Sequence, residues 1–265
     1  MQPNIQPDAR SDAWNPAQYD RFRDQRAQPF FDLLALVRPQ PDMNVVDLGC
    51  GTGELTRQMH ETLRAKQTLG IDHSDNMLSR AAAINVSGLR FQKGDLAAFD
   101  SPGAFDLVFS NAAIQWAPDH ANLLARLARC LRDGGQLAIQ VPANDDHITH
   151  EAARAVARQS PFRETLRGWT RDRAVLNVEI YAQILYDLGF REQNARLVVY
   201  PHLLDDRNAV VEWVKGTMLT DYQKRLPGEI WMSFLDAYRD ELFKFIPDIK
   251  PFFYPFKRIL FWAQK

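Results

Sequence analysis

A short segment around residue 50 contains residue types that bind a small ligand through the backbone. An apolar run at 45–48 carries an acid, Asp47, and leads into a turn with three glycines, Gly49, Gly51 and Gly53. Glycine adopts positive φ without steric cost and lets the backbone approach a ligand closely. Open α/β sheets bind ligands at the carboxyl ends of their strands, so this turn predicts a ligand site. Its Gly-x-Gly-x-Gly spacing differs from the Gly-x-Gly-x-x-Gly of dinucleotide-binding turns.

A second acid, Asp72, ends the next apolar run at 67–71. A carboxylate at the tip of the second strand can accept hydrogen bonds from both hydroxyls of a ribose, and its charge strengthens these bonds. NAD enzymes also place an acid here, so Asp72 indicates an adenosine nucleoside without choosing the cofactor. Ser74 is expected to cap the following helix. Met77 on that helix packs either on an adenine ring or in the core, and both interpretations stay open.

Two later segments add polar residues at the same edge of the predicted sheet. Asp95 and Leu96 follow a strand and a glycine, and the alternative for Asp95 is a solvated loop aspartate. The apolar strand at 105–110 opens onto Asn111, Gln115 and Trp116. Because parallel strands end at one edge of a sheet, these side chains are expected near the glycine turn.

These four segments, in this order, resemble the cofactor motifs of class I S-adenosylmethionine-dependent methyltransferases. The resemblance implies that the glycine turn holds the methionine part of S-adenosylmethionine, that the second acid holds the ribose, and that the third segment contacts the adenine. The residues so implied in cofactor binding are Asp47, Gly49, Gly51, Gly53, Asp72, His73, Met77, Asp95, Leu96 and Asn111. The product of the cofactor would be S-adenosylhomocysteine.

Alternating strand and helix patterns supply the scaffold for these residues. They predict an α/β, Rossmann-like fold with a seven-stranded, mostly parallel sheet, helices on both faces and a helical lid. Asp119 is expected to cap one helix and Gly189 to end another. Strands are predicted near 44–48, 67–71, 88–92, 105–110, 135–141, 196–203 and 256–263, and helices near 53–65, 75–84, 119–132, 146–160 and 178–188.

Residues 14–265 are expected to form one domain after a flexible polar stretch at 1–13. A helical flap is predicted at 14–37, with Pro29 breaking or kinking it into two helices. A helical cap is predicted at about 144–176 and 204–250, where 161–176 is irregular and rich in arginine. Large apolar residues recur at helical spacing in 213–245, and they indicate mainly the core of this cap rather than a substrate wall.

From Trp14 onward the chain resembles the trans-aconitate methyltransferases, class I enzymes that esterify one carboxylate of an unsaturated tricarboxylic acid. Segments such as Trp14-Asn-Pro-x-x-Tyr19 and Ser110-Asn-Ala-Ala-Ile-Gln-Trp116 carry the resemblance, with weaker support from 140–150, 200–214 and 255–261. It implies that an N-terminal flap with Tyr19 and Arg26 binds the cofactor. It also implies an acceptor site, whose candidates are Gln115, Trp116, Tyr200, His202 and Arg258. The alternative for the arginine is a surface position.

Two positions depart from that family's pattern. Thr220 and Gln28 stand where the family usually has arginine. Several carboxylates need several charged partners, so the acceptor stays open between a tricarboxylate, a less charged acid and another small molecule. A carboxylate is already a nucleophile at pH 7, so we expect no catalytic base and a mechanism based on proximity.

Composition argues against several classes of partner. The formal net charge of −1 over 265 residues indicates no clustered basic surface for nucleic acid. We find no apolar run long enough to span a membrane and no signal-like N-terminus. The two cysteines, Cys50 and Cys130, favour a reducing compartment. We therefore expect a cytoplasmic monomer or homodimer that acts on a small molecule, with no membrane, nucleic-acid or metal partner.

Three other functions fit parts of the sequence. A malonyl-carrier-protein carboxyl methyltransferase has a similar Asn-x-x-x-Gln-Trp stretch, and the arginines at 163–173 would then be its docking surface. A natural-product O- or N-methyltransferase with a helical lid is the second alternative. A protein that only binds S-adenosylmethionine, as an adaptor or sensor, is the third.

Overall fold

The computed structural model describes residues 23–171 and 175–265, with side chains from residue 27 onward. The described chain forms a seven-stranded sheet in the order β3-β2-β1-β4-β5-β7-β6. Only β7 runs antiparallel to its neighbours, so the predicted mostly parallel sheet is confirmed. The strands are β1 (Asn44–Leu48), β2 (Gln67–Asp72), β3 (Leu89–Lys93), β4 (Phe105–Asn111), β5 (Leu131–Pro142), β6 (Glu192–Leu204) and β7 (Phe252–Gln264).

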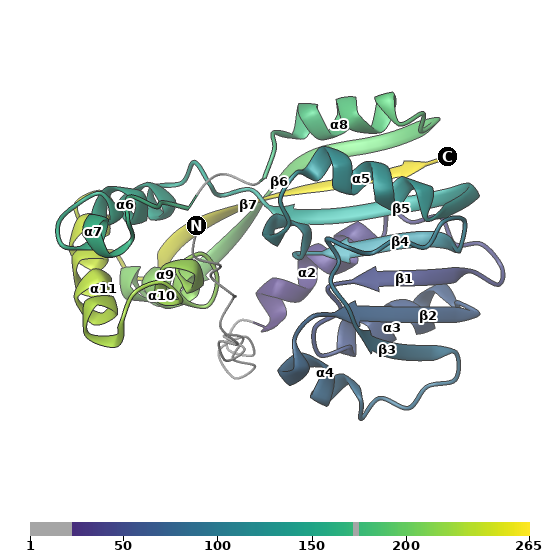
Figure 1. Cartoon of the computed structure of the whole chain (residues 1–265), viewed down its shortest axis with the longest axis horizontal. Helices are drawn as coiled ribbons and strands as arrows, with labels where there is room; N and C mark the ends of the chain where they lie inside the picture. The colour runs from purple at the N-terminus through teal and green to yellow at the C-terminus, as the bar shows by residue number, and fades with distance from the viewer. Residues whose placement is uncertain (1–22, 172–174) are drawn as a thin grey trace, which may run out of the picture.

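Helices cover both faces of this sheet, as predicted (Figure 1). On one face α2 (Arg23–Leu34) and α3 (Glu54–Leu63) pack on apolar side chains of β1, β4 and β7. On the other face α5 (His120–Arg129) and α8 (Val178–Asp187) pack on the alternate side chains of the same strands. Strands buried on both faces read as continuous apolar runs, which is why the sequence pattern located them well.

Local sequence signals fix several helix ends. The Ser74 hydroxyl accepts a hydrogen bond from the backbone N–H of Met77 at 3.1 Å and caps α4 (Asp75–Ala81). The carboxylate of Asp119 accepts from the N–H of Asn122 at 3.2 Å and caps α5. Gly189, with φ of 79°, follows the end of α8. The three predicted helix ends are confirmed. At each of them the chain passes between a helix and a loop at one edge of the sheet.

Other boundaries differ from the predicted ones. Helix α2 continues through Pro29 instead of dividing there, because the residues that follow it bury their side chains against the sheet. β5 begins at Leu131, where a helix was expected to end, and its pairing with β4 shifts register between Phe105 and Leu107. The supposedly irregular segment at 161–176 contains a short helix, α7 (Phe162–Thr165).

A second layer of helices covers the outer halves of β6 and β7, at the left of Figure 1. Its members are α6 (Ile148–Ala157), α7, α9 (Arg207–Lys215), α10 (Thr220–Gln223) and α11 (Gly228–Phe243). Most of the large apolar residues at 213–245 are buried here, so they form a core as predicted. Met232 and Phe245 are exceptions, because 58% and 60% of these residues are exposed. We call this layer the helical cap.

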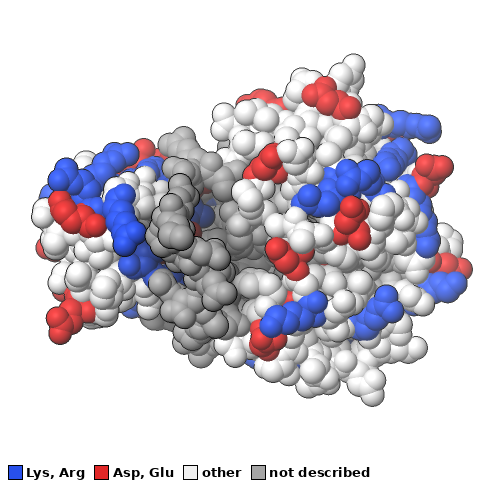
Figure 2. Space-filling view, viewed as in Figure 1, with Lys and Arg blue, Asp and Glu red and all other residues white. Residues whose placement is uncertain are grey.

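Surface properties of the described residues fit the composition. None of the described helices has the length and apolar character needed to cross a membrane. Both cysteines are buried thiols. Figure 2 shows that acidic and basic side chains of the described part are interspersed on the face in view. The predicted flexible stretch at 1–13, together with Trp14 and Tyr19, lies outside the described residues.

Candidate functional site

A cavity of about 800 Å³ lies where the carboxyl ends of the parallel strands meet the helical cap. Its size is within the range of small-molecule and cofactor sites. The sheet contributes the turns after β1, β2, β3 and β4 to the lining, and β5, β7 and α9 close the opposite side. Most of the polar residues singled out in the sequence therefore meet in one place, as the edge-of-sheet argument predicts.

The glycine turn after β1 has the backbone that only glycine adopts easily. Gly49, Gly51 and Gly53 have φ values of +85°, +57° and +77°. A Cβ on Gly49 would overlap the Cβ of Ala113, and one on Gly53 would lie 2.6 Å from the Phe91 ring. Gly51 instead faces open space. Two glycines are thus required by packing, and the middle one leaves room beside the backbone for a ligand.

Two buried acids lie beneath this turn. Asp47 is 3% exposed and accepts a hydrogen bond from the Thr56 hydroxyl at 2.6 Å. Burial raises the pKa of Asp47 to about 7, although the Thr56 hydrogen bond opposes this effect. Asp72 accepts from the N–H of Gly51 at 2.8 Å and from the N–H of Ser74 at 2.9 Å. Each of its oxygens keeps a lone pair, so Asp72 can hold the turn and still accept ligand hydroxyls.

The next part of the lining extends along β2 and β3. His73 lies beside Asp72, with 3.6 Å between its Nδ1 and the carboxylate. Met77 is 5% exposed and also lines the cavity, so core packing and ligand contact are compatible for it. Asp95 is exposed and accepts from the N–H of Ala97 at 2.8 Å, while Leu96 packs against the sheet core. All four side chains line the cavity.

Two residues with amide side chains, one at the end of β4 and one after it, line the cavity. Gln115 donates through Nε2 to the carbonyl oxygen of Ala112 at 2.6 Å, which fixes the orientation of its amide. Its Oε1 and the Oδ1 of Asn111 are buried and accept no hydrogen bond from any described residue. Both residues line the cavity, as does Trp116. Buried acceptors without donors are costly, and these two belong to residues that line the cavity.

Arg258 also lines the cavity and is only 4% exposed, which excludes the surface position considered for it. It extends from β7, donates through Nη1 to Gln140 Oε1 at 3.3 Å, and its guanidinium carbon lies 4.8 Å from the centroid of the Phe256 ring. Arginine buried at the wall of a cavity is suited to binding a carboxylate.

Tyr200 and His202, predicted as acceptor-binding residues, do not line the cavity. The Tyr200 hydroxyl donates to Asp32 at 2.6 Å on the α2 face of the sheet. His202 stacks on Trp213, with 4.8 Å between ring centroids. Both side chains are buried, but they pack against other residues and not at the cavity. The geometry therefore does not support a role for them in acceptor binding. The predicted roles of Tyr19 and Arg26 in cofactor binding stay predictions, because Tyr19 and the side chain of Arg26 lie outside the described part.

The burial of His202 predicts a pH effect on stability. Burial, aided by the charge of Arg258, lowers its pKa to about 4. Since the unfolded chain binds this proton near pH 6.5, the stabilising contribution is complete above that pH and is lost as the pH falls toward 4. We expect the wild type to lose roughly 2–3 kcal/mol relative to His202→Gln between pH 7.5 and 4.5. Urea unfolding of both proteins across this range measures the difference.

The comparison with the variant is necessary because Asp47 titrates in the same interval with the opposite sign. Its raised pKa means that stability from this group is lost as the pH rises through about 7. That contribution is the same in both proteins and cancels in the difference. A pH-independent difference would show that His202 is not buried in its neutral form.

The charges around the cavity are unevenly distributed. Four of the five acids that line the described cavity lie beneath the glycine turn and β2 to β3, and these are Asp47, Glu54, Asp72 and Asp95. The fifth, Asp145, lies on the cap side, where it pairs with Arg171 at 3.0 Å. Among the described lining residues the arginines are Arg258 and Arg171, both on the side of the helical cap, and there is no lysine. The sequence indicated Arg258, but it gave no reason to choose Arg171 from the arginine-rich segment.

The two positions that depart from the family pattern lie away from this lining. Gln28 is exposed and donates to Asp32 at 2.8 Å. Thr220 begins α10 and donates to the carbonyl oxygen of Thr217 at 2.5 Å. Neither residue lines the cavity. The absence of arginine at these two positions therefore removes no cation from the described cavity wall.

Fold and site together define an enzyme of the Rossmann-like methyltransferase class. A sequence profile for the methyltransferase domain matches residues 39–187. The chain is 44% identical to a trans-aconitate 2-methyltransferase of Deinococcus radiodurans, over 95% of this chain and 98% of the relative. It is 39% identical to the enzyme of the same name from Sinorhizobium medicae, over 90% and 92% of the two chains.

Solved structures share the fold at lower identity. The YcgJ protein of Bacillus subtilis superposes with a TM-score of 0.60 at 16% identity, over 90% of this chain and 98% of that chain. A phosphoethanolamine N-methyltransferase of Haemonchus contortus, in complex with S-adenosyl-L-methionine, superposes with a TM-score of 0.53 at 18% identity, over 90% of this chain and 52% of that chain. The chain therefore belongs to the class I S-adenosylmethionine-dependent methyltransferases.

Proposed function

We propose that this protein transfers a methyl group from S-adenosylmethionine to a carboxylate of trans-aconitate, or of a closely similar polycarboxylate, and so forms a monomethyl ester. The observation that carries the proposal is the uneven charge of the cavity, with four acids beneath the glycine turn and β2 to β3, and with both lining arginines beneath the cap, where the one acid, Asp145, is paired with Arg171. The relatives from Deinococcus and Sinorhizobium support the choice of acceptor, because they bear this name over most of the chain.

The acidic end fits S-adenosylmethionine. Gly51 faces open space where its backbone can approach the methionine part, and Asp72 has lone pairs left for the ribose hydroxyls. His73 beside this acid, with Met77, Asp95 and Leu96, would surround the adenosine. Asp47 would complement the positive charge of the ligand from below the turn. When bound, S-adenosylmethionine supplies a methyl group on a positively charged sulfur.

The opposite end fits the acceptor. Arg258 would pair with one carboxylate of the acid, and Trp116 and Gln115 would form the wall next to the reacting group. Asn111 and Gln115 line the cavity between its two halves, and their amide oxygens are buried. Carbonyl dipoles close to that place would complement the positive charge beside which the acceptor must lie.

The reaction requires little of the protein beyond the alignment of the acceptor with the methyl group. A carboxylate oxygen would form the new bond to the methyl carbon as the bond between that carbon and the sulfur breaks, which leaves neutral S-adenosylhomocysteine. No proton has to be removed, because the carboxylate is ionised at pH 7. The residues act by holding the acceptor in line and by limiting the access of water to the cavity. His202 and Tyr200 are not needed as bases, and burial and the neighbouring Asp32 raise the pKa of the tyrosine further above neutrality.

The function is tested with methyl-labelled S-adenosylmethionine and a panel of acceptors. The panel contains trans-aconitate, simpler dicarboxylates, a malonyl-loaded carrier protein, a phenol and an amine. We expect label in an ester that alkali hydrolyses, with trans-aconitate as the best acceptor. Transfer only to the phenol, the amine or the carrier protein would contradict the proposal and support one of the alternative methyltransferases. Binding of the cofactor without any transfer would support an adaptor or sensor.

Arg258→Ala is expected to raise KM for the carboxylate acceptor by tens of fold, because a hydrogen bond to a charged group contributes about 1.5–3 kcal/mol. Steady-state kinetics with trans-aconitate measures this change. The affinity for S-adenosylmethionine should be unaffected, because β1, β4 and β5 separate β7 from Asp72 on β2. Arg258→Lys keeps the charge and most of the buried side chain. It therefore separates the loss of the charged contact from the loss of packing in Arg258→Ala. An unchanged KM would mean that Arg258 only supports the wall of the cavity.

We propose further that the enzyme acts on a freely diffusing acid in the cytoplasm. The two cysteines support this location, because both are buried thiols that form no disulfide with each other. Secretion of the protein together with its activity outside the cell would contradict the location.

A further inference from the structure

One arginine of the arginine-rich segment at 161–176, Arg171, lies at the wall of the cavity. Arg163 is exposed and pairs with Glu164 on its own helix, and Arg167 is exposed as well. Arg173 lies outside the described residues. Arg171 alone of the described members lines the cavity, and its side chain is only 13% exposed. The segment is therefore not a uniform basic surface, and one of its arginines belongs to the acceptor side of the cavity.

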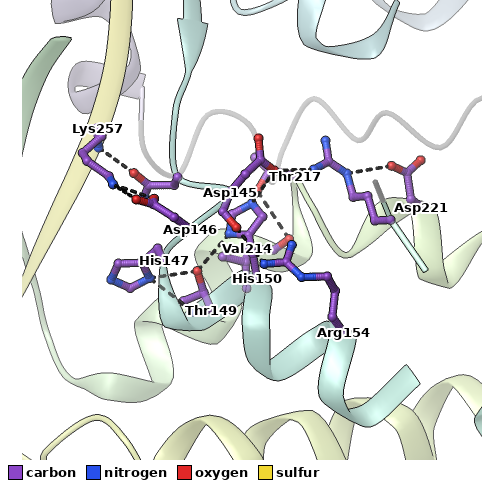
Figure 3. A network of polar contacts seen from close by, with 12 residues as sticks. Asp145, Asp146, His147, Thr149, His150, Arg154, Val214, Thr217, Asp221 and Lys257 are labelled. Carbon is purple, nitrogen blue, oxygen red and sulfur yellow. Dashed lines mark hydrogen bonds and ion pairs between the residues drawn. The ribbon is translucent and has the colours of Figure 1, made fainter. Parts of the chain in front are cut away.

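Two carboxylates from different parts of the chain hold Arg171. Its Nη1 donates to Asp145, just after β5, at 3.0 Å, and its Nε donates to Asp221 on α10 at 3.1 Å. Figure 3 shows both aspartates in one network with the start of α6. The guanidinium carbon lies 5.6 Å from the centroid of the Trp116 ring, which also lines the cavity. Arg171 is thereby fixed in position before any ligand arrives.

This anchoring leaves donors for a ligand. A guanidinium has five N–H groups, and two of them are used by the aspartates. Nη2 of Arg171 makes no hydrogen bond to a described residue. It is also not among the buried polar atoms that lack a partner. Further cations offset the two carboxylates, because Arg154 donates to the carbonyl oxygen of Asp145 at 2.8 Å and Arg225 lies 3.9 Å from Asp221. An anion bound to Arg171 is therefore not opposed by a net negative cluster.

Arg171 and Arg258 lie on two sides of the same short segment. On one side Lys257, next to Arg258, donates its backbone N–H to Asn144 Oδ1 at 2.7 Å. On the other side Asp145 accepts from Arg171 at 3.0 Å. Arg258 on β7 and Arg171 after α7 thus both contact or adjoin residues 144–145, and both line the cavity. This arrangement would allow them to bind two groups of one acceptor.

We propose that Arg171 binds a second carboxylate of the acceptor and determines specificity for polycarboxylic acids. The inference rests on the proposed function and deepens it. Arg258 takes one carboxylate and Arg171 another, while a third is left to receive the methyl group. Arg171 thus supplies a second cation at the cavity, and its partner Asp221 directly follows Thr220 in the sequence. Acids with fewer carboxylates bind more weakly because one of these contacts is lost.

The test compares Arg171→Gln with the wild type on trans-aconitate and on three diacids, mesaconate, itaconate and glutaconate, each of which lacks one of its carboxylates. We expect KM for trans-aconitate to rise about 10- to 100-fold in the variant with kcat little changed. One of the diacids that is still methylated should have the same KM in both proteins, because it lacks the carboxylate that Arg171 binds. Arg171→Lys, which keeps the charge but loses the fork, should restore part of the affinity.

Arg163→Gln is the matched control, because it removes a cation from the same segment outside the cavity and should change nothing. If Arg171→Gln raises KM for every acid equally, or weakens S-adenosylmethionine binding to the same extent, Arg171 is a structural strut and the inference is wrong. If the glutamine variant does not fold, the lysine variant is compared across the same acids with the same criterion. If the wild type esterifies no carboxylic acid, the proposed function itself fails. Esterification by the wild type with an unchanged KM in the variant refutes only the role of Arg171.

Discussion

Replacing Asp72 with alanine is expected to weaken S-adenosylmethionine binding about a hundredfold or more. The carboxylate accepts hydrogen bonds from the backbone N–H groups of Gly51 and Ser74 at 2.8 and 2.9 Å, and we propose that it also accepts from the ribose. Two charge-assisted hydrogen bonds to a ligand contribute about 3 kcal/mol or more together. Titration calorimetry with S-adenosylmethionine and S-adenosylhomocysteine measures the loss.

The loss should be specific to this carboxylate. Asp75→Asn removes an acid three residues away whose carboxylate is exposed and pairs with Lys93 at 2.6 Å, so it is the matched control and should leave the affinity unchanged. Asp72→Asn keeps one oxygen acceptor, so its affinity for S-adenosylmethionine should lie between those of Asp72→Ala and the wild type. Equal affinity in Asp72→Ala and the wild type would place the ribose elsewhere and remove the basis for the cofactor site.

Gly49→Ala is expected to destabilise the protein by roughly 2–5 kcal/mol and to abolish measurable cofactor binding. The added Cβ would overlap that of Ala113, and the residue has a φ of +85° that other residues rarely adopt. Overpacking a rigid site costs about 1–3 kcal/mol, and the left-handed backbone costs about 1–2 kcal/mol more. Thermal or urea unfolding gives the stability, and calorimetry gives the affinity.

A second substitution separates these two costs. Ala113→Gly combined with Gly49→Ala removes the overlap and leaves the backbone cost, so it should recover a large part of the stability. Gly51 has a φ of +57°, and a Cβ there would meet nothing within 4 Å, so Gly51→Ala should cost only the left-handed backbone, about 1–2 kcal/mol, and still hinder the ligand. A double variant no more stable than Gly49→Ala would show that the overlap with Ala113 is not the cause.

The cofactor end of the site could be predicted from the sequence because local signals determine it. The acids and glycines after β1 and β2 lie within a few residues of strands that the apolar pattern locates, and their position at the sheet edge follows from parallel topology. The backbone geometry of Gly49 and Gly53 also follows from residue type. No distant part of the chain had to be placed to reach these conclusions.

The acceptor end depends on contacts between distant segments, and there the sequence was less informative. Strand alternation indicates that Tyr200 and His202 share a face of β6, but it does not tell whether that face borders a cavity or a core. Arg171 is held by residues 26 and 50 positions away, so nothing near it in the sequence marks it. The extended lengths of β6 and β7 likewise arise from their pairing with each other and from the cap that they carry.

The position of β7 between β5 and β6 has a consequence for synthesis of the chain. Since β6 joins the sheet only through β7, a nascent polypeptide exposes β6 and the helices after it before their partner has left the ribosome. Exposed strand edges and apolar surface at this stage invite misassembly. Closure of the methyl-transfer chamber is therefore a late event of maturation, and a protein shortened before β7 would have neither a completed sheet nor a support for its arginine-bearing wall.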